Sequence, residues 1–517
     1  MACSCLLFHR LSNTLHFERV ISVVKEFSIP ISRRDLFKLA GLTAAGVALS
    51  GSSHVDAAEP PKQQGFNFNG AQIPTLLRAD VCVIGGGSAG TAAAVTAARN
   101  GASVVLIEKG SVLGGLQTQG LVYPAMPTRI PNSDTPYITD LNKRFSMHGI
   151  NVSFTDEPQY KNGGDARQYT PELLAFIYDE LCADYKVQVL YNATLIGANT
   201  ADGKISAAIV HTVEGLSKIE ANIFIDATGD AALSRYAGVK VERGSEHTGR
   251  NQKMSFRFEM GGVEEMKVYK FFVKKLKDGW CESKPPEFEF AKTTYTEKFY
   301  YEGIQRGEVT KDDVAYIQAF TIIGKPGTMS MNCPEVSPYL FSSTNALDRS
   351  KAIRECRIMI RRLAHFFQKN IPGFKKAYIS REASMLGVRE SWRIQGKYCL
   401  KSEDYFNAQK FPDAVCRTAY PIDIHDEVLD NARNLAKGEF YEIPYRSLVT
   451  NEISNLIVVG RCISTDFPVQ SSVRIQPTCM SMGEAAGIAS AYGLKNNIAV
   501  NAIDWASIPN RSYVSQG

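Results

Sequence analysis

The sequence lacks any pair of cysteines in C-x-x-C spacing, although it contains eleven cysteines. They are scattered over the chain as Cys3, Cys5, Cys82, Cys182, Cys281, Cys333, Cys356, Cys399, Cys416, Cys462 and Cys479. Without close pairs, neither a dithiol redox centre nor a zinc knuckle is expected, and no metal site is indicated. A chain of 517 residues can bury a large core without disulfides, so we expect most of the cysteines to be buried thiols.

A strong charge of one sign and a long apolar run are also missing. Lys and Arg number 58 and Asp and Glu 53, which leaves a formal net charge of +5. This charge is too small and too dispersed to indicate binding to nucleic acid or to an anionic membrane. The apolar run near the N-terminus, residues 39–49, is well short of the ~20 residues that span a bilayer, so no stable membrane span is expected.

The apolar run follows two adjacent arginines, Arg33 and Arg34, and small residues lead from it to a plausible peptidase site after Ala57. This order is typical of a twin-arginine signal, which the translocation machinery of that route reads on a folded bacterial protein. We therefore expect residues 1–57 to be a signal region, residues 58–77 a flexible lead-in, and the protein to be periplasmic or otherwise extracytoplasmic. The alternative is a chance Arg-Arg pair before an ordinary helix.

A glycine-rich turn stands between a short apolar run, residues 79–84, and an Ala-rich helical stretch, residues 91–99. A second apolar run, residues 103–107, ends in an acid. In dinucleotide-binding units the glycines permit a tight turn, close approach of the pyrophosphate and helix packing, while the acid accepts hydrogen bonds from the ribose. The predicted contacts are Gly85, Gly87, Ser88, Ala89, Gly90 and Glu108. An acid at this place argues against a 2′-phosphate, and hence against NADP.

Five further segments follow this unit in order. They are the Gly-Gly stretch in residues 108–120, residues 187–194, the Asp-Ala-Thr-Gly-Asp stretch in residues 226–230, residues 455–461, and the helix start in residues 476–487. In these segments the chain resembles the FAD-dependent oxidoreductase family of the glutathione-reductase-like flavoproteins, from about residue 78 to 495. The resemblance implies FAD as the cofactor. It also implies FAD contacts at Lys109, Gly114, Gly115, Thr118, Ala193, Gly229, Asp230, Gly460, Arg461, Thr478, Cys479 and Met480.

The resemblance also implies where each segment meets FAD. The Gly-Gly stretch lies along the pyrophosphate, residues 187–194 form a strand that brackets the adenine, and residues 455–461 end at the ribityl chain. Superfamily members often have Gly-Asp where this chain has Gly460-Arg461, so an acid contact to the ribityl hydroxyls is not implied. The N–H groups that open the helix in residues 476–487 face the flavin, where a positive helix end stabilises the anionic reduced form.

The expected fold is α/β, a Rossmann-like FAD-binding domain of the glutathione-reductase type with an inserted α+β substrate or cap domain. We place the FAD-binding domain at 78–240 and 441–500, the substrate domain at 241–440 and a C-terminal tail at 501–517. Residues 255–260 alternate as a strand does, and residues 350–369 predict an amphipathic helix with Ser350 as N-cap. No second G-x-G-x-x-G follows a strand in residues 150–440, so no dedicated NAD(P)H domain is expected.

Two clusters are candidates for the reacting side of the site. Residues 387–394 match the family's Arg-Glu-Ser segment, and a helix there would place Arg389 and Arg393 on one face as a fork for a carboxylate or phosphate. A strand in residues 420–426 would put Asp423 and His425 on one face, where the acid tunes the imidazole into a base near neutral pH.

Two other arginines, Arg461 and Arg474, flank the flavin-side segment, where either can pair with a substrate anion or with the pyrimidine edge of the flavin. Purely structural roles stay open as well. Arg389 can form an ion pair with Glu390, and His425 can be a hydrogen-bonded structural histidine.

The sequence predicts an exported FAD-dependent oxidoreductase that exchanges hydride with a small organic substrate and electrons with an external acceptor or donor other than NAD(P). The predicted catalytic residues are His425, Asp423, Arg389 and Arg474. Export in folded form suits a protein that takes up its cofactor in the cytoplasm. A flavin-dependent isomerase or lyase without net redox change is the alternative, and an intact fingerprint disfavours a vestigial binding protein.

Overall fold

The computed structural model describes residues 73–515, apart from residues 124, 132, 153, 155–168, 276–287 and 426–433. The predicted signal region and most of the predicted lead-in lie outside the described residues. No helix in the described part of the chain is long and apolar enough to cross a membrane. The described cysteines are all free, and all but Cys399 are buried, as expected.

A seven-stranded sheet carries the glycine-rich turn. Its order is β3-β2-β1-β6-β5-β4, and β18 pairs with β6 as well. The pairs β1–β2, β2–β3, β1–β6 and β6–β18 are parallel, whereas the pairs β5–β6 and β4–β5 are antiparallel. The bounds are β1 (Thr75–Ile84), β2 (Val104–Ile107), β3 (Gln188–Leu190), β4 (Thr194–Ala201), β5 (Lys204–Thr212), β6 (Gly215–Asp226) and β18 (Leu456–Val458). This sheet confirms the predicted Rossmann-like fold.

The parallel strands are covered on both faces where β1, β2, β6 and β18 end side by side, which is why these ends are buried and almost wholly apolar. Val81 and Val83 of β1 belong to the core on one face, together with the alanines of α3 (Ser88–Arg99). Cys82 and Ile84 point to the other face and join a second core. Successive side chains of β1 therefore belong to two separate cores, one on each face of the sheet.

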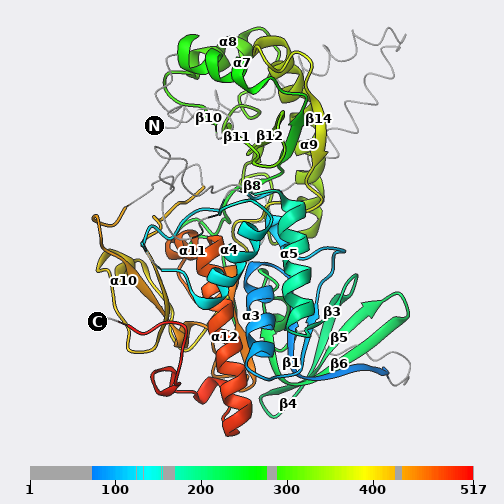
Figure 1. Ribbon diagram of the computed structural model, residues 1–517, viewed down its shortest axis with the longest axis vertical. Helices are drawn as coiled ribbons and strands as arrows, with labels where there is room; N and C mark the ends of the chain where they lie inside the picture. The colour runs from blue at the N-terminus through cyan, green and yellow to red at the C-terminus, as the bar shows by residue number, and fades with distance from the viewer. Residues whose placement is uncertain are drawn as a thin grey trace, which may run out of the picture. The chain divides into compact units, whose positions relative to one another are not determined.

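Two helices from opposite ends of the chain pack against each other beside the sheet, α3 and α12 (Gln476–Asn496), drawn blue and red in Figure 1. At two glycines of α12 the helices approach so closely that there is no room for a side chain. A Cβ atom at Gly483 would lie 2.1 Å from the carbonyl oxygen of Ala89, and one at Gly487 would lie 2.7 Å from that of Ala93. The glycines of α12 thus bring its first turns close to the glycine-rich turn that opens α3.

A separate five-stranded antiparallel sheet has the order β10-β11-β12-β9-β14. Its strands are β9 (Phe258–Gly261), β10 (Glu289–Ala291), β11 (Gln318–Thr321), β12 (Thr328–Met331) and β14 (Tyr378–Glu382). Phe258 and Met260 of β9 lie opposite Met331 and Met329 of β12 and belong to the core, whereas Glu259 faces the other way, opposite Ser330. One face of the sheet is therefore apolar and the other polar.

Shorter strands and the remaining helices connect these parts. The strand pairs are β7 (Val241–Arg243) with β15 (Trp392–Ile394), β8 (Met254–Ser255) with β13 (Glu335–Val336), and β16 (Ala414–Thr418) with β17 (Tyr441–Pro444). The helices are α4 (Pro136–Met147), α5 (Pro171–Asp184), α6 (Ala232–Tyr236), α7 (Glu265–Lys270), α8 (Glu297–Gln305), α9 (Ala346–Asn370), α10 (Ser402–Phe406) and α11 (Phe467–Val473).

Several local expectations were wrong. The expected strand over residues 187–194 is interrupted by a turn in which Asn192 has φ +53°, because β3 follows β2 and β4 turns away to pair with β5. The strand over residues 255–260 is divided between β8 and β9, which have different partners. The long helix α9 begins earlier than expected, because the side chain of Asn345 caps it by accepting from the N–H of Asp348.

The helix expected over residues 387–394 is absent, because Trp392, Arg393 and Ile394 form β15 and pair with β7. Residues 420–425 lie outside the named strands, and Asp426 outside the described residues. The alternation expected there is nevertheless present: Ile422 and Ile424 are buried, and Asp423 and His425 are partly exposed.

Candidate active site

The glycine-rich turn combines two close contacts with one open position. A Cβ atom at Gly85, which has φ +101°, would lie 2.6 Å from the carbonyl oxygen of Ala227. One at Gly90 would lie 1.8 Å from the carbonyl oxygen of Gly85. A Cβ atom at Gly87, by contrast, would meet nothing within 4 Å. The turn is thus closed where the helix meets the strand and open where a pyrophosphate is expected to approach.

Glu108 at the end of β2 is buried and ties the turn to the strand. Its Oε2 atom accepts from the N–H of Gly86 at 2.9 Å, and its Oε1 atom from the N–H of Gly110 at 2.7 Å. Oε1 also accepts from Nε2 of Gln119 at 3.4 Å, so Oε2 is the carboxylate oxygen that keeps a second lone pair with which a ribose hydroxyl can bond. The N–H of Ala193 donates to the backbone oxygen of Glu108 at 3.1 Å, whereas Lys109 is exposed.

The Gly-Gly stretch lies directly beside the turn. Gly114 forms a parallel bridge with Gly87 and donates to the carbonyl oxygen of Gly86 at 2.7 Å. A Cβ atom at Gly115 would lie 3.2 Å from the Cα atom of Gly87. The hydroxyl of Thr118 donates to the carbonyl oxygen of Leu113 at 2.6 Å and so closes this stretch on itself. Two glycine segments that are apart in sequence therefore line one side of the expected pyrophosphate position.

Ser88, another predicted FAD contact, uses its hydroxyl in a hydrogen bond within the protein. The hydroxyl of Ser88, in the first turn of α3, donates to Oε1 of Gln117 at 2.5 Å. Gln117 in turn donates to Gln476, the first residue of α12, at 3.0 Å. The starts of α3 and α12 are thus linked through one side chain.

Arg461 is held against the Asp-Ala-Thr-Gly-Asp segment. A Cβ atom at Gly229 would lie 2.5 Å from Nη2 of Arg461, and that nitrogen lies 3.8 Å from Oδ1 of Asp230. Asp230 also forms an ion pair with Arg349 at 2.9 Å. Burial opposes the ionisation of Asp230, but Arg349 holds the pKa of its carboxyl below the usual range. Gly460, the neighbour of Arg461, has φ +83° and lies against Ala89, so these predicted contacts reach the start of α3.

The start of α12 contains a polar group without a partner. The hydroxyl of Thr478 is buried and makes no hydrogen bond to the described residues. The thiol of Cys479 is neutral near pH 7, because burial raises its pKa to about 12, and Met480 is fully buried. An unpartnered hydroxyl and the free N–H groups of a helix start fit a polar, electron-accepting ring system. The residues present therefore fit a dinucleotide that ends in a flavin.

The four predicted catalytic residues belong to one connected network. Nδ1 of His425 lies 3.1 Å from Oε1 of Glu335, and its Nε2 lies 3.5 Å from Oδ1 of Asp423. Arg389 reaches the same Oε1 atom of Glu335 at 2.5 Å, and Arg474 reaches Oδ2 of Asp423 at 3.3 Å. The histidine thus stands between two carboxylates, each of which has an arginine of its own.

Both carboxylates of the network are ionised at neutral pH. Burial would raise the pKa of Glu335, but the charges of Arg389 and His425 hold it at about 2. Burial opposes the ionisation of Asp423 too, but His425 and Arg474 hold its pKa below the usual range. The closer of the two carboxylates, Glu335, fixes the imidazole through Nδ1, whereas the 3.5 Å contact at Nε2 is at the limit of a hydrogen bond. Asp423 thus lies beside the imidazole as expected, and Glu335 is a second, closer acid that orients it.

Glu335 was not identified in the sequence. It stands on the two-residue strand β13, opposite Ser255, and belongs to no motif. The edge of the Tyr316 ring packs on His425 with 5.5 Å between the ring centroids, and Tyr316 too lacks a sequence signal. Only the pairing of distant strands places these side chains at the histidine.

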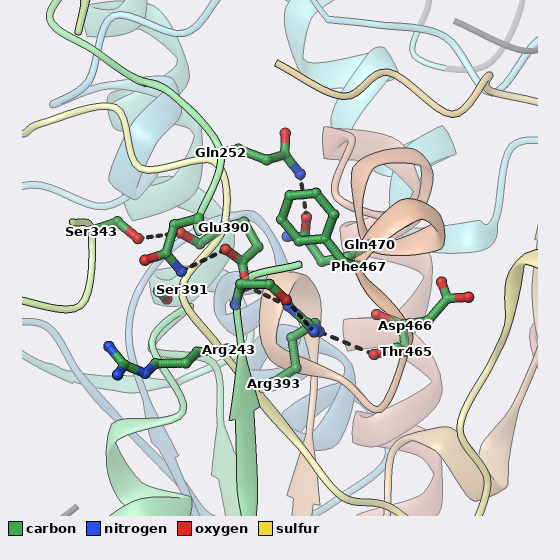
Figure 2. Close-up of polar contacts among 12 residues, drawn as sticks. Arg243, Gln252, Ser343, Glu390, Ser391, Arg393, Thr465, Asp466, Phe467 and Gln470 are labelled. Carbon is green, nitrogen blue, oxygen red and sulfur yellow. Dashed lines mark hydrogen bonds and ion pairs between the residues drawn. The ribbon is translucent and has the colours of Figure 1, made fainter. Parts of the chain in front are cut away.

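Arg393 is not part of this network, because it pairs with Glu390 in a second one (Figure 2). The side chains of Arg393 and Glu390 are 1% and 0% exposed. Arg393 also donates to the backbone oxygens of Thr465 at 3.0 Å and Gly244 at 3.1 Å. The fork expected from Arg389 and Arg393 is therefore wrong, and so is the pairing of Arg389 with Glu390.

Two buried glutamines contact each other and hold the backbone at Arg389, and Figure 2 shows the contact between them. Nε2 of Gln252 donates to Oε1 of Gln470 at 2.9 Å, and Nε2 of Gln470 donates to the backbone oxygen of Arg389 at 2.9 Å. The backbone oxygen of His425 accepts from the N–H of Lys253 at 2.8 Å. The backbone on both sides of the histidine network is thus fixed by hydrogen bonds.

The fold and these contacts together define a flavoprotein with one nucleotide-binding sheet and a second sheet beside it. The sequence matches the FAD dependent oxidoreductase family over residues 80–511, and the chain belongs to that family. It is an FAD-dependent oxidoreductase, and its cofactor is FAD. No curated protein matches the chain.

Several solved structures are similar to the chain at low identity. A geranylgeranyl bacteriochlorophyll reductase-like protein from Thermoplasma acidophilum is 15% identical over 81% of this chain and 80% of that one, with a TM-score of 0.40. A flavin-dependent brominase is 14% identical over 83% and 81%, with a TM-score of 0.42. L-proline dehydrogenase from P. horikoshii is 13% identical over 84% and 97%, with a TM-score of 0.37. These proteins differ in chemistry, so they carry no indication of the substrate.

Proposed function

We propose that the enzyme oxidises a small organic substrate by hydride transfer to FAD and passes the electrons to an acceptor other than NAD(P). The observation that carries the proposal is the arrangement of His425. Its Nδ1 is held by the ionised, buried Glu335, so in the neutral imidazole the proton rests on Nδ1 and the lone pair on Nε2. An imidazole oriented in this way is suited to accept a proton.

In the proposed step, His425 takes a proton from a substrate hydroxyl or amine through Nε2. When bound, FAD supplies a two-electron acceptor for the hydride from the adjacent carbon. Asp423 lies 3.5 Å from Nε2 and stabilises the imidazolium that forms, while Arg474 keeps Asp423 in place at 3.3 Å. Arg474 is also only two residues from Gln476, where α12 begins. This network therefore adjoins the helix start that is expected to face the flavin.

The sheet topology supports an acceptor other than NAD(P). Every parallel pairing between named strands of the described residues belongs to the one seven-stranded sheet. A second nucleotide-binding sheet, of the kind that holds NAD(P)H, is thus absent from the described part of the chain.

The expected test is reduction of the purified flavoprotein without oxygen. We expect a small organic compound from a substrate panel to bleach the flavin absorbance, and NADH and NADPH to bleach it far more slowly. Rapid bleaching by either nucleotide contradicts the proposed acceptor class. Turnover of a substrate without any flavin reduction favours an isomerase or lyase instead.

We also propose that the protein acts outside the bacterial cytoplasm, on the basis of Arg33-Arg34 and the apolar run that follows them. Replacement of both arginines by lysine is expected to retain the full chain, loaded with FAD, in the cytoplasm. Fractionation of expressing cells measures this, with flavin content as the control for folding. Equal export of the double variant and the wild type contradicts the proposal.

A further inference from the structure

Arg257 is a buried cation without a counter-charge. It is 6% exposed and precedes β9, and its Nη1 donates to the backbone oxygens of Leu121 at 3.1 Å and Tyr123 at 3.4 Å. It forms no ion pair with any of the described residues, and its Nε atom is buried without a hydrogen-bond partner. Burial lowers the pKa of Arg257 to about 10, so the guanidinium is still charged near neutral pH. A buried charge of this kind is costly unless something pairs with it.

The neighbouring charges cannot serve as its partners because they are already engaged. Glu335 pairs with Arg389, and Asp423 pairs with Arg474. Glu259, two residues along the chain, pairs with Lys325 at 3.2 Å and accepts from the hydroxyl of Tyr123 at 2.6 Å. The fixed acids are thus balanced by other cations, and Arg257 remains as the unbalanced positive charge.

A second unpartnered polar atom lies across the sheet from Arg257. Asn332 follows Met331, and Arg257 precedes Phe258, and these two neighbours are the last register pair of β12 and β9. Nδ2 of Asn332 donates to Oε1 of Gln318 at 2.9 Å, but its Oδ1 is buried and has no partner among the described residues. Arg257 and Asn332 therefore present one unmet donor and one unmet acceptor on the polar face of the five-stranded sheet.

This pair is connected to the proposed base. Nδ2 of Asn332 also lies 3.4 Å from the hydroxyl of Tyr316, and the Tyr316 ring packs edge-on against His425. The carbonyls that Arg257 contacts, those of Leu121 and Tyr123, follow the Gly-Gly stretch beside the glycine-rich turn. The unmet donor and acceptor thus lie between the nucleotide-binding segment and the histidine.

We propose that Arg257 binds a carboxylate of the substrate and that Oδ1 of Asn332 accepts from a hydroxyl or amino group beside it. The substrate class is then a small hydroxy or amino acid. This inference rests on the proposed function, because it supplies the substrate for the same site. Nη1 of the guanidinium donates to the two carbonyl oxygens. The side of the group that contains Nε can donate to the two oxygens of a carboxylate.

The test is a titration of the full chain loaded with FAD, without oxygen, followed through the visible spectrum of the flavin. The probes are glycolate, lactate, glycine and alanine, each paired with its carboxamide. We expect at least one acid to perturb or bleach the flavin and its amide to bind far more weakly. Arg257→Met is expected to weaken binding of that acid by at least about 30-fold. Arg257→Lys keeps the charge but not the planar fork, so its affinity for the acid is expected to lie between those of the wild type and Arg257→Met.

Controls separate recognition from folding. Arg361→Met removes an arginine whose side chain is 66% exposed and is expected to bind as the wild type does. Asn332→Asp is nearly isosteric and is expected to weaken binding of the acid about 10-fold or more, because it adds a negative charge beside it. Flavin content near that of the wild type shows that each variant is folded.

The outcomes distinguish this inference from the proposed function. Equal binding of acids and amides, wild-type affinity in Arg257→Met, or no response to any acid of the panel overturns the inference. Flavin reduction by a neutral compound would then leave the proposed function standing. Conversely, acid binding that depends on Arg257 but never reduces the flavin supports the recognition site and contradicts the proposed oxidation.

Discussion

Gly90→Ala is expected to yield a protein that is purified with little or no FAD. The added Cβ atom would lie 1.8 Å from the carbonyl oxygen of Gly85 and 3.0 Å from the Cβ atom of Ala227. Relief by movement of α3 is blocked on its other side, because Gly483 of α12 already leaves no room against Ala89. Overpacking at backbone costs roughly 1–3 kcal/mol or more, and here the distortion falls on the turn that binds the cofactor. The ratio of flavin to protein absorbance after purification measures the effect.

Gly87→Ala is the matched variant, because it adds the same methyl group to the same turn. Its Cβ atom would meet nothing within 4 Å, so the apoprotein is expected to unfold at the wild-type temperature. The methyl group instead occupies the space in which the pyrophosphate is expected, so FAD affinity is expected to fall. Gly90→Ala is expected to lower both the unfolding temperature of the apoprotein and the flavin content. A Gly90→Ala protein that retains wild-type flavin content contradicts this account of the turn.

The features that could be predicted from the sequence are those in which the chemistry depends on a few consecutive residues. The turn from Gly85 to Gly90 has its strand, its helix and its acid within one short stretch, and all of them appear where expected. The alternation of Ile422 and Ile424 with Asp423 and His425 was likewise predictable, although no named strand forms there, because burial alone sets it.

The features that could not be predicted depend on pairing between distant segments. Arg389 and Arg393 have helical spacing in the sequence, but pairing of β15 with β7 extends the backbone and directs Arg393 to Glu390. Glu335 contacts His425 only because β13 pairs with β8. The missing counter-charge of Arg257 was equally hidden, because it becomes evident only when every nearby acid is seen to be paired.

His425→Ala is expected to slow reduction of the bound flavin by substrate about 10²–10⁴-fold, the usual contribution of a general base. The rate constant of the reductive half-reaction, measured by stopped flow without oxygen, is the quantity to compare. His365→Ala, at an exposed position on α9, is the matched control and is expected to reduce at the wild-type rate. Flavin content and acid affinity are expected to change little in His425→Ala, because the proposed recognition groups are Arg257 and Asn332.

Glu335→Gln separates the role of the base from that of its orienting acid. The amide keeps the size of the side chain but removes the charge that holds the proton on Nδ1 of His425, so a smaller loss, about 10-fold or more, is expected. Because the pKa of Glu335 is about 2, its carboxylate stays ionised as the pH falls from 9 to 5, and its orienting effect is expected to persist over that range. If His425→Ala reduces as fast as the wild type with the same pH profile, the histidine is only a structural partner of Glu335, and the base must be sought among other groups.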